Sequence, residues 1–177
     1  MRKLLLLSSI GVAIALAASA CGDDTGSGGG APAGNCFDYA SFSGDSPAVT
    51  FSGDVLPIFQ RSCGVSGSSC HGSEAGTSDR PFLGPPMTAT TTPAQIAAIR
   101  VQNVGVPSTK EPGMSRIAAG DAANSFLMHK MDATFECEDL TCASDKSCGA
   151  VMPLGQALAQ GERDIVRRWI LQGALDN

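Results

Sequence analysis

Aromatic residues and histidine are scarce in this sequence. Aromatics make up 5% of the 177 residues, as one Trp, one Tyr and seven Phe, and there are two histidines. Nine aromatic side chains supply little bulk for a hydrophobic core, and we therefore expect another feature to stabilise the fold. Basic residues are also in the minority, with 12 Lys and Arg against 17 Asp and Glu. The absence of a basic excess argues against a nucleic-acid binder, which needs cations to neutralise phosphates.

Catalytic motifs are missing as well. The sequence contains no nucleophile–base pair, paired catalytic carboxylates, phosphate-binding loop or dinucleotide fingerprint, so we do not expect an enzyme. What the sequence does have is seven cysteines. Its length suits one compact domain.

The first 20 residues have the pattern of an export signal. A positively charged start precedes an apolar run over residues 4–18 that ends in small residues. The tetrapeptide at 18–21 (Ala-Ser-Ala-Cys) resembles the lipobox of bacterial lipoproteins, with Ala18 at the position usually taken by Leu. This resemblance implies a signal peptide over residues 1–20 and lipidation of Cys21. The alternative is a plain secretory signal that leaves this cysteine as an odd thiol.

Residues 21–35 are polar and rich in Gly and Ser, so we expect a flexible tether between the anchor and a domain over residues 36–177. A lipidated protein of this kind is extracytoplasmic and is held to a bacterial membrane, either on the periplasmic face or at the cell surface. The membrane is then one partner, through the lipid. Export also places the remaining cysteines in an oxidising compartment, where they pair or carry a cofactor.

One cysteine pair has a histidine beside it. Cys63 and Cys70 have the spacing C-x6-C, and His71 follows at once. The ending resembles a haem c attachment site, in which two cysteines form thioethers and the adjacent histidine ligates the iron, although the ordinary spacing is C-x2-C-H. A second possibility is a single thioether at Cys70, with Cys63 paired elsewhere. A third is a Cys63–Cys70 disulfide that closes the Gly/Ser-rich loop, with His71 at the surface.

Apolar residues recur with helical period in several segments, so the sequence predicts an all-α fold with long loops. The first helix is expected over residues 53–61, with Asp54 as its N-cap and Pro57 in the first turn. Two further helices are expected over residues 93–102, behind a Thr92 cap, and from an Asp121 cap through residue 130.

The C-terminal segment predicts a further helix. Glu162 near its start and Arg167 and Arg168 further along suit the helix dipole. Gly173 is placed to end it.

Three segments together resemble the class I c-type cytochrome domain, in the form found in bacterial lipoproteins and planctomycete-type cytochrome modules. They read DVLPIFQRSC…SCHG, IAAGDAANSFLMHKM and MPLG…GERDIVRRWILQGA, over about residues 53–174. The resemblance implies one covalent haem c, with His71 as the proximal and Met152 as the distal iron ligand. Cys70 and Cys63 would be the thioether cysteines. It also implies that the C-terminal helix packs across the helix that leads into the haem site.

The other methionines and the second histidine are weaker candidates for the iron. A thioether is a soft donor that suits low-spin iron, and Met152 lies in an exposed Met-Pro loop that is a poor place for a packing residue, which is its alternative role. Met128 and Met131 are expected in the core, and Met114 competes less well. We expect His129 at the surface or the rim, with bis-histidine ligation as the alternative.

Residues 134–150 look like a cysteine-rich insertion. Zinc is disfavoured because no histidine lies nearby, and calcium because the D-x-D-x-D-G spacing is absent. A disulfide within the insertion and one from Cys36 to its remaining cysteine would leave Cys63 and Cys70 for haem, although the count also fits three disulfides. The cysteines of the insertion are Cys137, Cys142 and Cys148.

These features predict a membrane-tethered cytochrome c-like protein that passes single electrons to and from a redox protein partner. The alternative is a haem-free, disulfide-stapled lipoprotein of the same fold with a binding or structural role. A third option is a haem sensor or peroxidase-like module in which Met152 leaves the iron.

Overall fold

The computed structural model describes residues 36–136, 140–143 and 147–177. The predicted signal peptide, the tether, Cys21 and Cys137 lie outside these described residues. Within them, no helix combines the length and the apolar character needed to cross a membrane.

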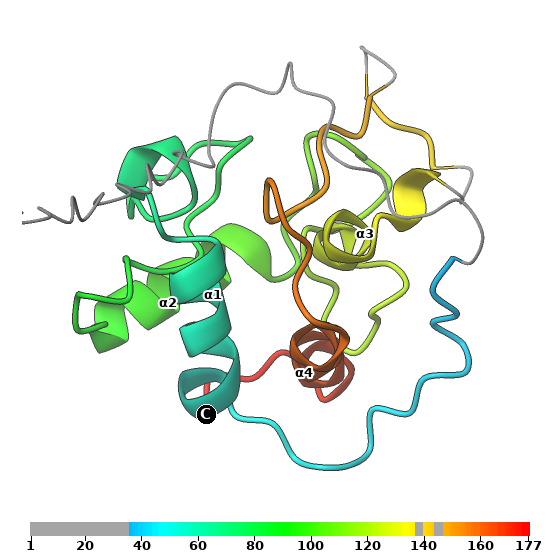
Figure 1. Ribbon diagram of the computed structural model, residues 1–177, viewed down its shortest axis with the longest axis horizontal. Helices are drawn as coiled ribbons and strands as arrows, with labels where there is room; N and C mark the ends of the chain where they lie inside the picture. The colour runs from blue at the N-terminus through cyan, green and yellow to red at the C-terminus, as the bar shows by residue number, and fades with distance from the viewer. Residues whose placement is uncertain (1–35, 137–139, 144–146) are drawn as a thin grey trace, which may run out of the picture.

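Helices and long loops make up the described part of the chain, which contains no strand beyond isolated bridges. This confirms the all-α class (Figure 1). The described residues form four α-helices: α1 (Leu56–Ser62), α2 (Pro93–Asn103), α3 (Phe126–Asp132) and α4 (Gln160–Leu171). Three shorter helical turns are the π-helical η1 (Phe51–Val55) and the 3-10 turns η2 (Gly67–Ser69) and η3 (Thr134–Glu136).

The first helical segment begins earlier than predicted, because Asp54 is not its N-cap. The π-helical turn η1 leads into α1, and its N-cap residue is Thr50. The Asp54 carboxylate accepts hydrogen bonds from the backbone N–H and the hydroxyl of Thr50, both at 2.8 Å. These bonds lower the pKa of Asp54. Asp54 thus satisfies the start of the helix from inside the first turn, while Pro57 lies in the first turn of α1 as expected.

The helix α2 matches its prediction. Its N-cap is Thr92, whose hydroxyl accepts the Gln95 N–H while the Gln95 side chain accepts the Thr92 N–H, which is a complete capping box. Pro93 occupies the first turn, where its missing N–H leaves no hydrogen bond unmade.

The helix α3 is shorter than predicted and starts at Phe126, with Ser125 as its N-cap. Asp121 caps a separate turn instead: its carboxylate accepts the Asn124 N–H at 3.0 Å, and its carbonyl accepts the Ser125 hydroxyl at 2.7 Å. Asp121 therefore accepts the hydrogen bonds expected of a cap, but the turn that it caps ends before α3 begins.

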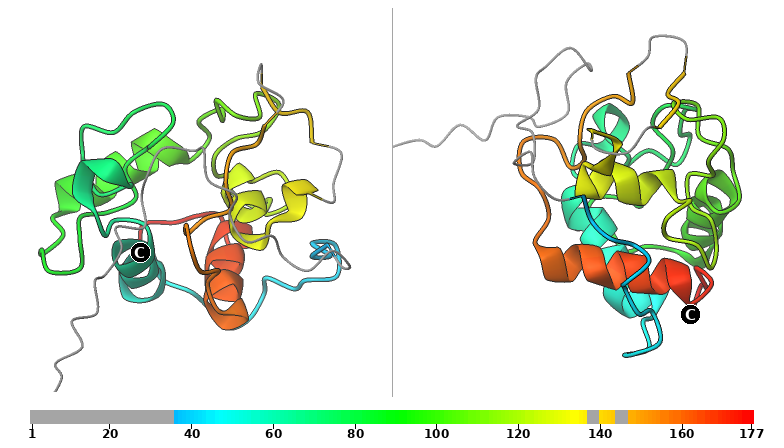
Figure 2. Two further views of the ribbon diagram at one scale, coloured as in Figure 1. Left: turned by 45° about the horizontal axis from the view of Figure 1, so that its top comes forward. Right: turned by 90° about the vertical axis from the view of Figure 1, so that its right-hand side faces the viewer.

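The helix α4 packs against η1 and α3. Its Trp169 contacts the rings of Phe51 and Phe59, with centroid distances of 5.2 and 6.2 Å. Phe59 lies on α1, so the C-terminal helix contacts the helix before Cys63, as the resemblance implies. Figure 2 shows α3 and α4 running side by side, with α1 crossing them. Gly173, at φ 98°, ends the helix as predicted.

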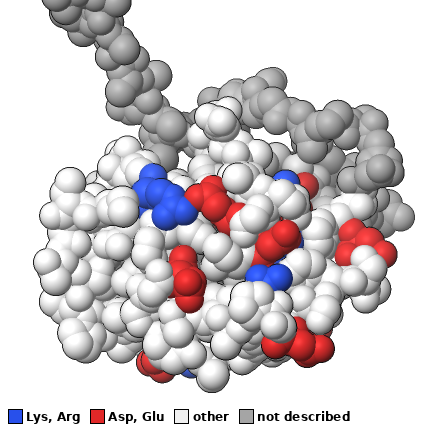
Figure 3. All heavy atoms as spheres, turned by 60° about the horizontal axis from the view of Figure 1, so that its bottom comes forward, with Lys and Arg blue, Asp and Glu red and all other residues white. Residues whose placement is uncertain are grey.

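The charge on the face drawn in Figure 3 is distributed rather than gathered. Acidic side chains are scattered over it, with a few basic ones between them. This matches the acidic composition and offers no single-sign patch on that face.

Candidate functional site

A cavity of about 300 Å³ lies between the segment after α1 and the loop that precedes α4. This volume falls at the lower end of the range of about 300–1,000 Å³ that is usual for small-molecule sites. All four predicted haem-binding residues lie on its wall. The lining residues are Ser62, Cys63, Ser69, Cys70, His71, Asp79, Arg80, Leu83, Leu127, Lys130, Met131, Met152, Pro153 and Leu154.

The six residues between Cys63 and Cys70 fold into a compact loop that contains η2. The His71 N–H donates to the Cys63 carbonyl at 3.0 Å, which closes the loop. Two glycines allow the tight packing: a Cβ on Gly64 or on Gly72 would lie 2.4 Å from a backbone oxygen. The long spacing therefore places both cysteines and the histidine on the wall of one cavity.

The His71 ring is oriented by one hydrogen bond. Its Nδ1 lies 2.8 Å from the Pro81 carbonyl oxygen. A carbonyl only accepts, so Nδ1 carries the proton and Nε2 keeps its lone pair. Among the described residues, no hydrogen bond reaches Nε2. A neutral imidazole with one nitrogen held by a carbonyl and the other unpaired is the usual form of a metal-ligating histidine.

The electrostatic surroundings keep this imidazole neutral. Burial is the largest effect and lowers the pKa of His71, and the hydrogen bond to the Pro81 carbonyl opposes it in part. The positive charges of Lys130, Arg80 and Arg116 lower the pKa further. His71 therefore keeps the Nε2 lone pair at neutral pH.

Met152 reaches the same cavity from the loop before α4. Its N–H donates to the Lys130 carbonyl at 2.8 Å. Met152 and His71 also border a second cavity of about 100 Å³ beside the first. Met128 and Met131 are buried as expected, and Met131 additionally lines the larger cavity.

The described cysteines are in two states, one free thiol and four disulfide-bonded sulfurs. Cys63 carries a free thiol, and burial raises its pKa to about 12. The Cys63–Cys70 disulfide considered above is therefore not formed. Cys142 and Cys148 are bonded to each other, which confirms a disulfide within the insertion. Cys36 and Cys70 are both disulfide-bonded. A sulfur in a disulfide cannot form a thioether, so Cys63 is the wall cysteine that already has a thiol.

His129 is buried, which corrects the expectation of a surface or rim position. Its Nδ1 lies 2.6 Å from the Thr134 hydroxyl and its Nε2 lies 2.8 Å from the Ala123 carbonyl. The ring also packs against Tyr39, with centroids 5.3 Å apart. Both nitrogens are engaged, so this arrangement does not support bis-histidine ligation.

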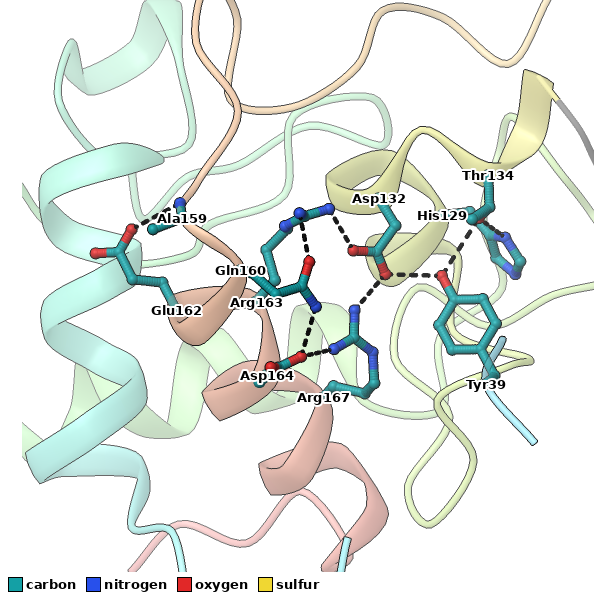
Figure 4. A network of polar contacts seen from close by, with 10 residues as sticks. All are labelled: Tyr39, His129, Asp132, Thr134, Ala159, Gln160, Glu162, Arg163, Asp164 and Arg167. Atoms are coloured by element: carbon teal, nitrogen blue, oxygen red, sulfur yellow. Dashed lines mark hydrogen bonds and ion pairs between the residues drawn. The ribbon is translucent and has the colours of Figure 1, made fainter. Parts of the chain in front are cut away.

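A buried network of charges next to the site was not predicted. Arg167 is fully buried on α4 and donates to Asp132 at 2.7 Å and to Asp164 (Figure 4). Arg163 also donates to Asp132, at 2.8 Å. The available signal was the position of Arg167 three residues before the apolar Ile170, because this spacing places both side chains on one face of the helix.

The described part of the chain holds no group of three or more His, Cys, Asp or Glu side chains that could bind a metal ion. Comparisons of the chain with known protein families, curated proteins and solved structures find no match. The chemistry of the site is therefore argued from its own donors, an imidazole and a thioether that line one cavity.

Proposed function

We propose that this chain is a membrane-tethered, extracytoplasmic electron-transfer protein of cytochrome c-like fold, which binds one haem c in the 300 Å³ cavity. One observation carries the proposal. His71 and Met152 come from distant segments and border the same two cavities, and no described residue forms a hydrogen bond with the histidine Nε2.

The donors of the cavity fit a haem. A neutral imidazole and a thioether are the ligand pair that gives haem iron a relatively high potential. When bound, the haem supplies an iron that accepts and returns one electron. The chain's own contribution is to orient His71 through Pro81 and to hold Met152 through Lys130. Apolar side chains on the wall, such as Leu83, exclude water from the ligands.

The cysteines decide how the haem is attached. A thioether forms when a thiol S–H adds across a vinyl group, with the hydrogen going to the vinyl carbon. Cys63 has the required thiol. Cys70 acquires one only when a dithiol reductant opens its disulfide, so attachment at both cysteines requires reduction first.

A second candidate function follows from the same cysteines. With Cys70 disulfide-bonded and Cys142 bonded to Cys148, the domain is a disulfide-stapled protein that needs no haem for its crosslinks. It would be a lipoprotein with a binding or structural role, with the same anchor at Cys21.

The test is to make the full chain together with a haem c maturation system and to measure haem absorbance and mass after denaturation. We expect one covalent haem per chain. Met152→Ala should keep the covalent haem but lose the thioether–iron absorption band, and His71→Ala should lose low-spin iron. A chain that carries disulfides and no haem after this treatment contradicts electron transfer and supports the second candidate.

The anchor has a test of its own. Lipidation at Cys21 predicts that the chain fractionates with membranes and that Cys21→Ser releases it. A Cys21→Ser chain that stays with the membrane contradicts lipid tethering at this residue.

A further inference from the structure

Lys130 contacts the loop that carries Met152 at two points. We define the Met152 loop as residues 148–154. The backbone carbonyl of Lys130 accepts the Met152 N–H at 2.8 Å. The ammonium group of the same residue donates to the Cys148 carbonyl at 2.8 Å. One residue of α3 therefore holds both the start of this loop and the residue that faces the cavity.

Lys130 itself is held in place by its surroundings on α3. Lys130 lies between two buried residues of α3, His129 and Met131. Its ammonium group lies 5.8 and 5.5 Å from the ring centroids of Phe126 and Phe135. These cation–π contacts restrict the side chain and help to direct the ammonium group.

The start of the loop is also held by contacts that do not involve Lys130. Cys148 is buried and is bonded to Cys142. The neighbouring Ala143 N–H donates to the Lys110 carbonyl at 2.6 Å. The Cys148 carbonyl is thus fixed in place opposite the Lys130 ammonium group.

We propose that Lys130 is the positioning residue for Met152: its ammonium group pins the Met152 loop against α3 and so keeps the thioether at the cavity. This inference rests on the proposed function, because Met152 acts as a ligand only if haem is bound. The two states are a closed loop and an open one in which Met152 has left the cavity. An added ligand for the iron binds the open state, so its apparent affinity rises with the open fraction.

The side chain and the backbone of Lys130 contribute separately. The carbonyl bond to Met152 is available to any residue at this position, whereas the bond to Cys148 needs a long cationic side chain. A charge-assisted hydrogen bond is among the stronger ones, and its loss should raise the open fraction about tenfold.

The first arm of the test measures hydrogen exchange of residues 148–154 in the full chain. Lys130→Met should speed this exchange about tenfold. Lys130→Gln, whose shorter side chain does not reach Cys148, should act alike, and Lys130→Arg should restore slow exchange. Arg168→Met is the matched control. Arg168 is a half-buried cation on α4 whose guanidinium lies 5.4 Å from the ring centroid of Phe42, and it is not among the described residues that line the cavity.

The second arm measures imidazole binding to the oxidised holoprotein. Lys130→Met should bind imidazole about tenfold more tightly, while Lys130→Arg and Arg168→Met stay within about twofold of the unaltered protein. Urea unfolding of each variant separates loop opening from a general loss of stability.

The outcomes separate the two proposals. Holoprotein with unchanged exchange and unchanged imidazole affinity in Lys130→Met overturns the role of Lys130 and leaves electron transfer standing. A chain that takes up no haem overturns electron transfer and, with it, the ligand role of Met152. An equal effect of Arg168→Met shows that the loss of a positive charge, rather than the loss of the contact with Cys148, loosens the loop, and this also overturns the inference.

Discussion

Replacing Asp132 by Asn tests how much the buried ion pairs between α3 and α4 contribute to the stability of the fold. The Asp132 carboxylate is fully buried and accepts from Arg163 at 2.8 Å and from Arg167 at 2.7 Å. The Tyr39 hydroxyl donates to it at 3.0 Å. Burial, followed by the charge of Asp132, raises the pKa of Tyr39, so the hydroxyl keeps its proton and remains a donor.

The magnitude follows from what remains after the change. Asn keeps the shape of the side chain but removes the charge that compensates Arg167. That guanidinium is fully buried, stacked 3.4 Å from the centroid of Phe37, and would be left with Asp164 alone. Removing one partner of a buried ion pair costs about 3–5 kcal/mol. Since domains of this size have about 5–15 kcal/mol in total, Asp132→Asn should lose a large part of the stability.

The assay is urea unfolding followed by the fluorescence of Trp169, the single tryptophan, which lies on α4. The matched control is the double variant Asp132→Asn with Arg167→Met, which removes the unpaired charge and should recover stability relative to Asp132→Asn alone. A loss below about 1 kcal/mol for Asp132→Asn would mean that the charges are solvated, as for an exposed pair, and would refute the reasoning from burial.

Three further predictions concern local features. Thr92→Ala removes the α2 capping box and should cost about 1 kcal/mol in urea unfolding, whereas Thr90→Ala, at an exposed loop position, should cost almost nothing. A hydrogen bond from Arg61 lowers the pKa of Glu162 below its ordinary value of 4.5. The ionised carboxylate therefore stabilises the fold at a pH above 4.5, and this contribution is lost as the pH falls through the lowered pKa. The stability gap between the unaltered protein and Glu162→Gln should therefore narrow on acidification, and a constant gap would contradict the ion pair. Opening the Cys142–Cys148 bond by a double Ser substitution should cost about 2 kcal/mol and speed hydrogen exchange in residues 148–154, and unchanged exchange would show that the bond does not restrain that loop.

Local sequence signals predicted those helix ends that local contacts decide. Thr92 with Gln95 forms a complete capping box within four residues, and Gly173 adopts the positive φ that ends α4. The Asp signals were ambiguous, because Asp54 and Asp121 each satisfy a turn without being the N-cap of a helix. An Asp in a short polar segment offers the same acceptor to either arrangement, and the sequence does not choose between them.

For the candidate site, too, the sequence predicted only the features that neighbouring residues determine. The adjacency of Cys70 and His71 is visible in the sequence, whereas the hydrogen bond from His71 to Pro81 and the approach of Met152 depend on the fold. His129 was placed wrongly because its two partners, Thr134 and Ala123, meet it only once the turns at both ends of α3 have formed.

The two sides of the cavity have separate supports, and this separation matters for its chemistry. The His71 side is held by its own segment, through Cys63, Pro81 and Leu83. The Met152 side is held by α3, which the buried charges fasten to α4 at Asp132, two residues after Lys130. A disturbance of the α3–α4 contact therefore reaches Met152 while His71 keeps its orientation. In a protein that exchanges electrons through an iron held by these two residues, the histidine would be the fixed ligand. The position of the methionine would depend on the contact between α3 and α4.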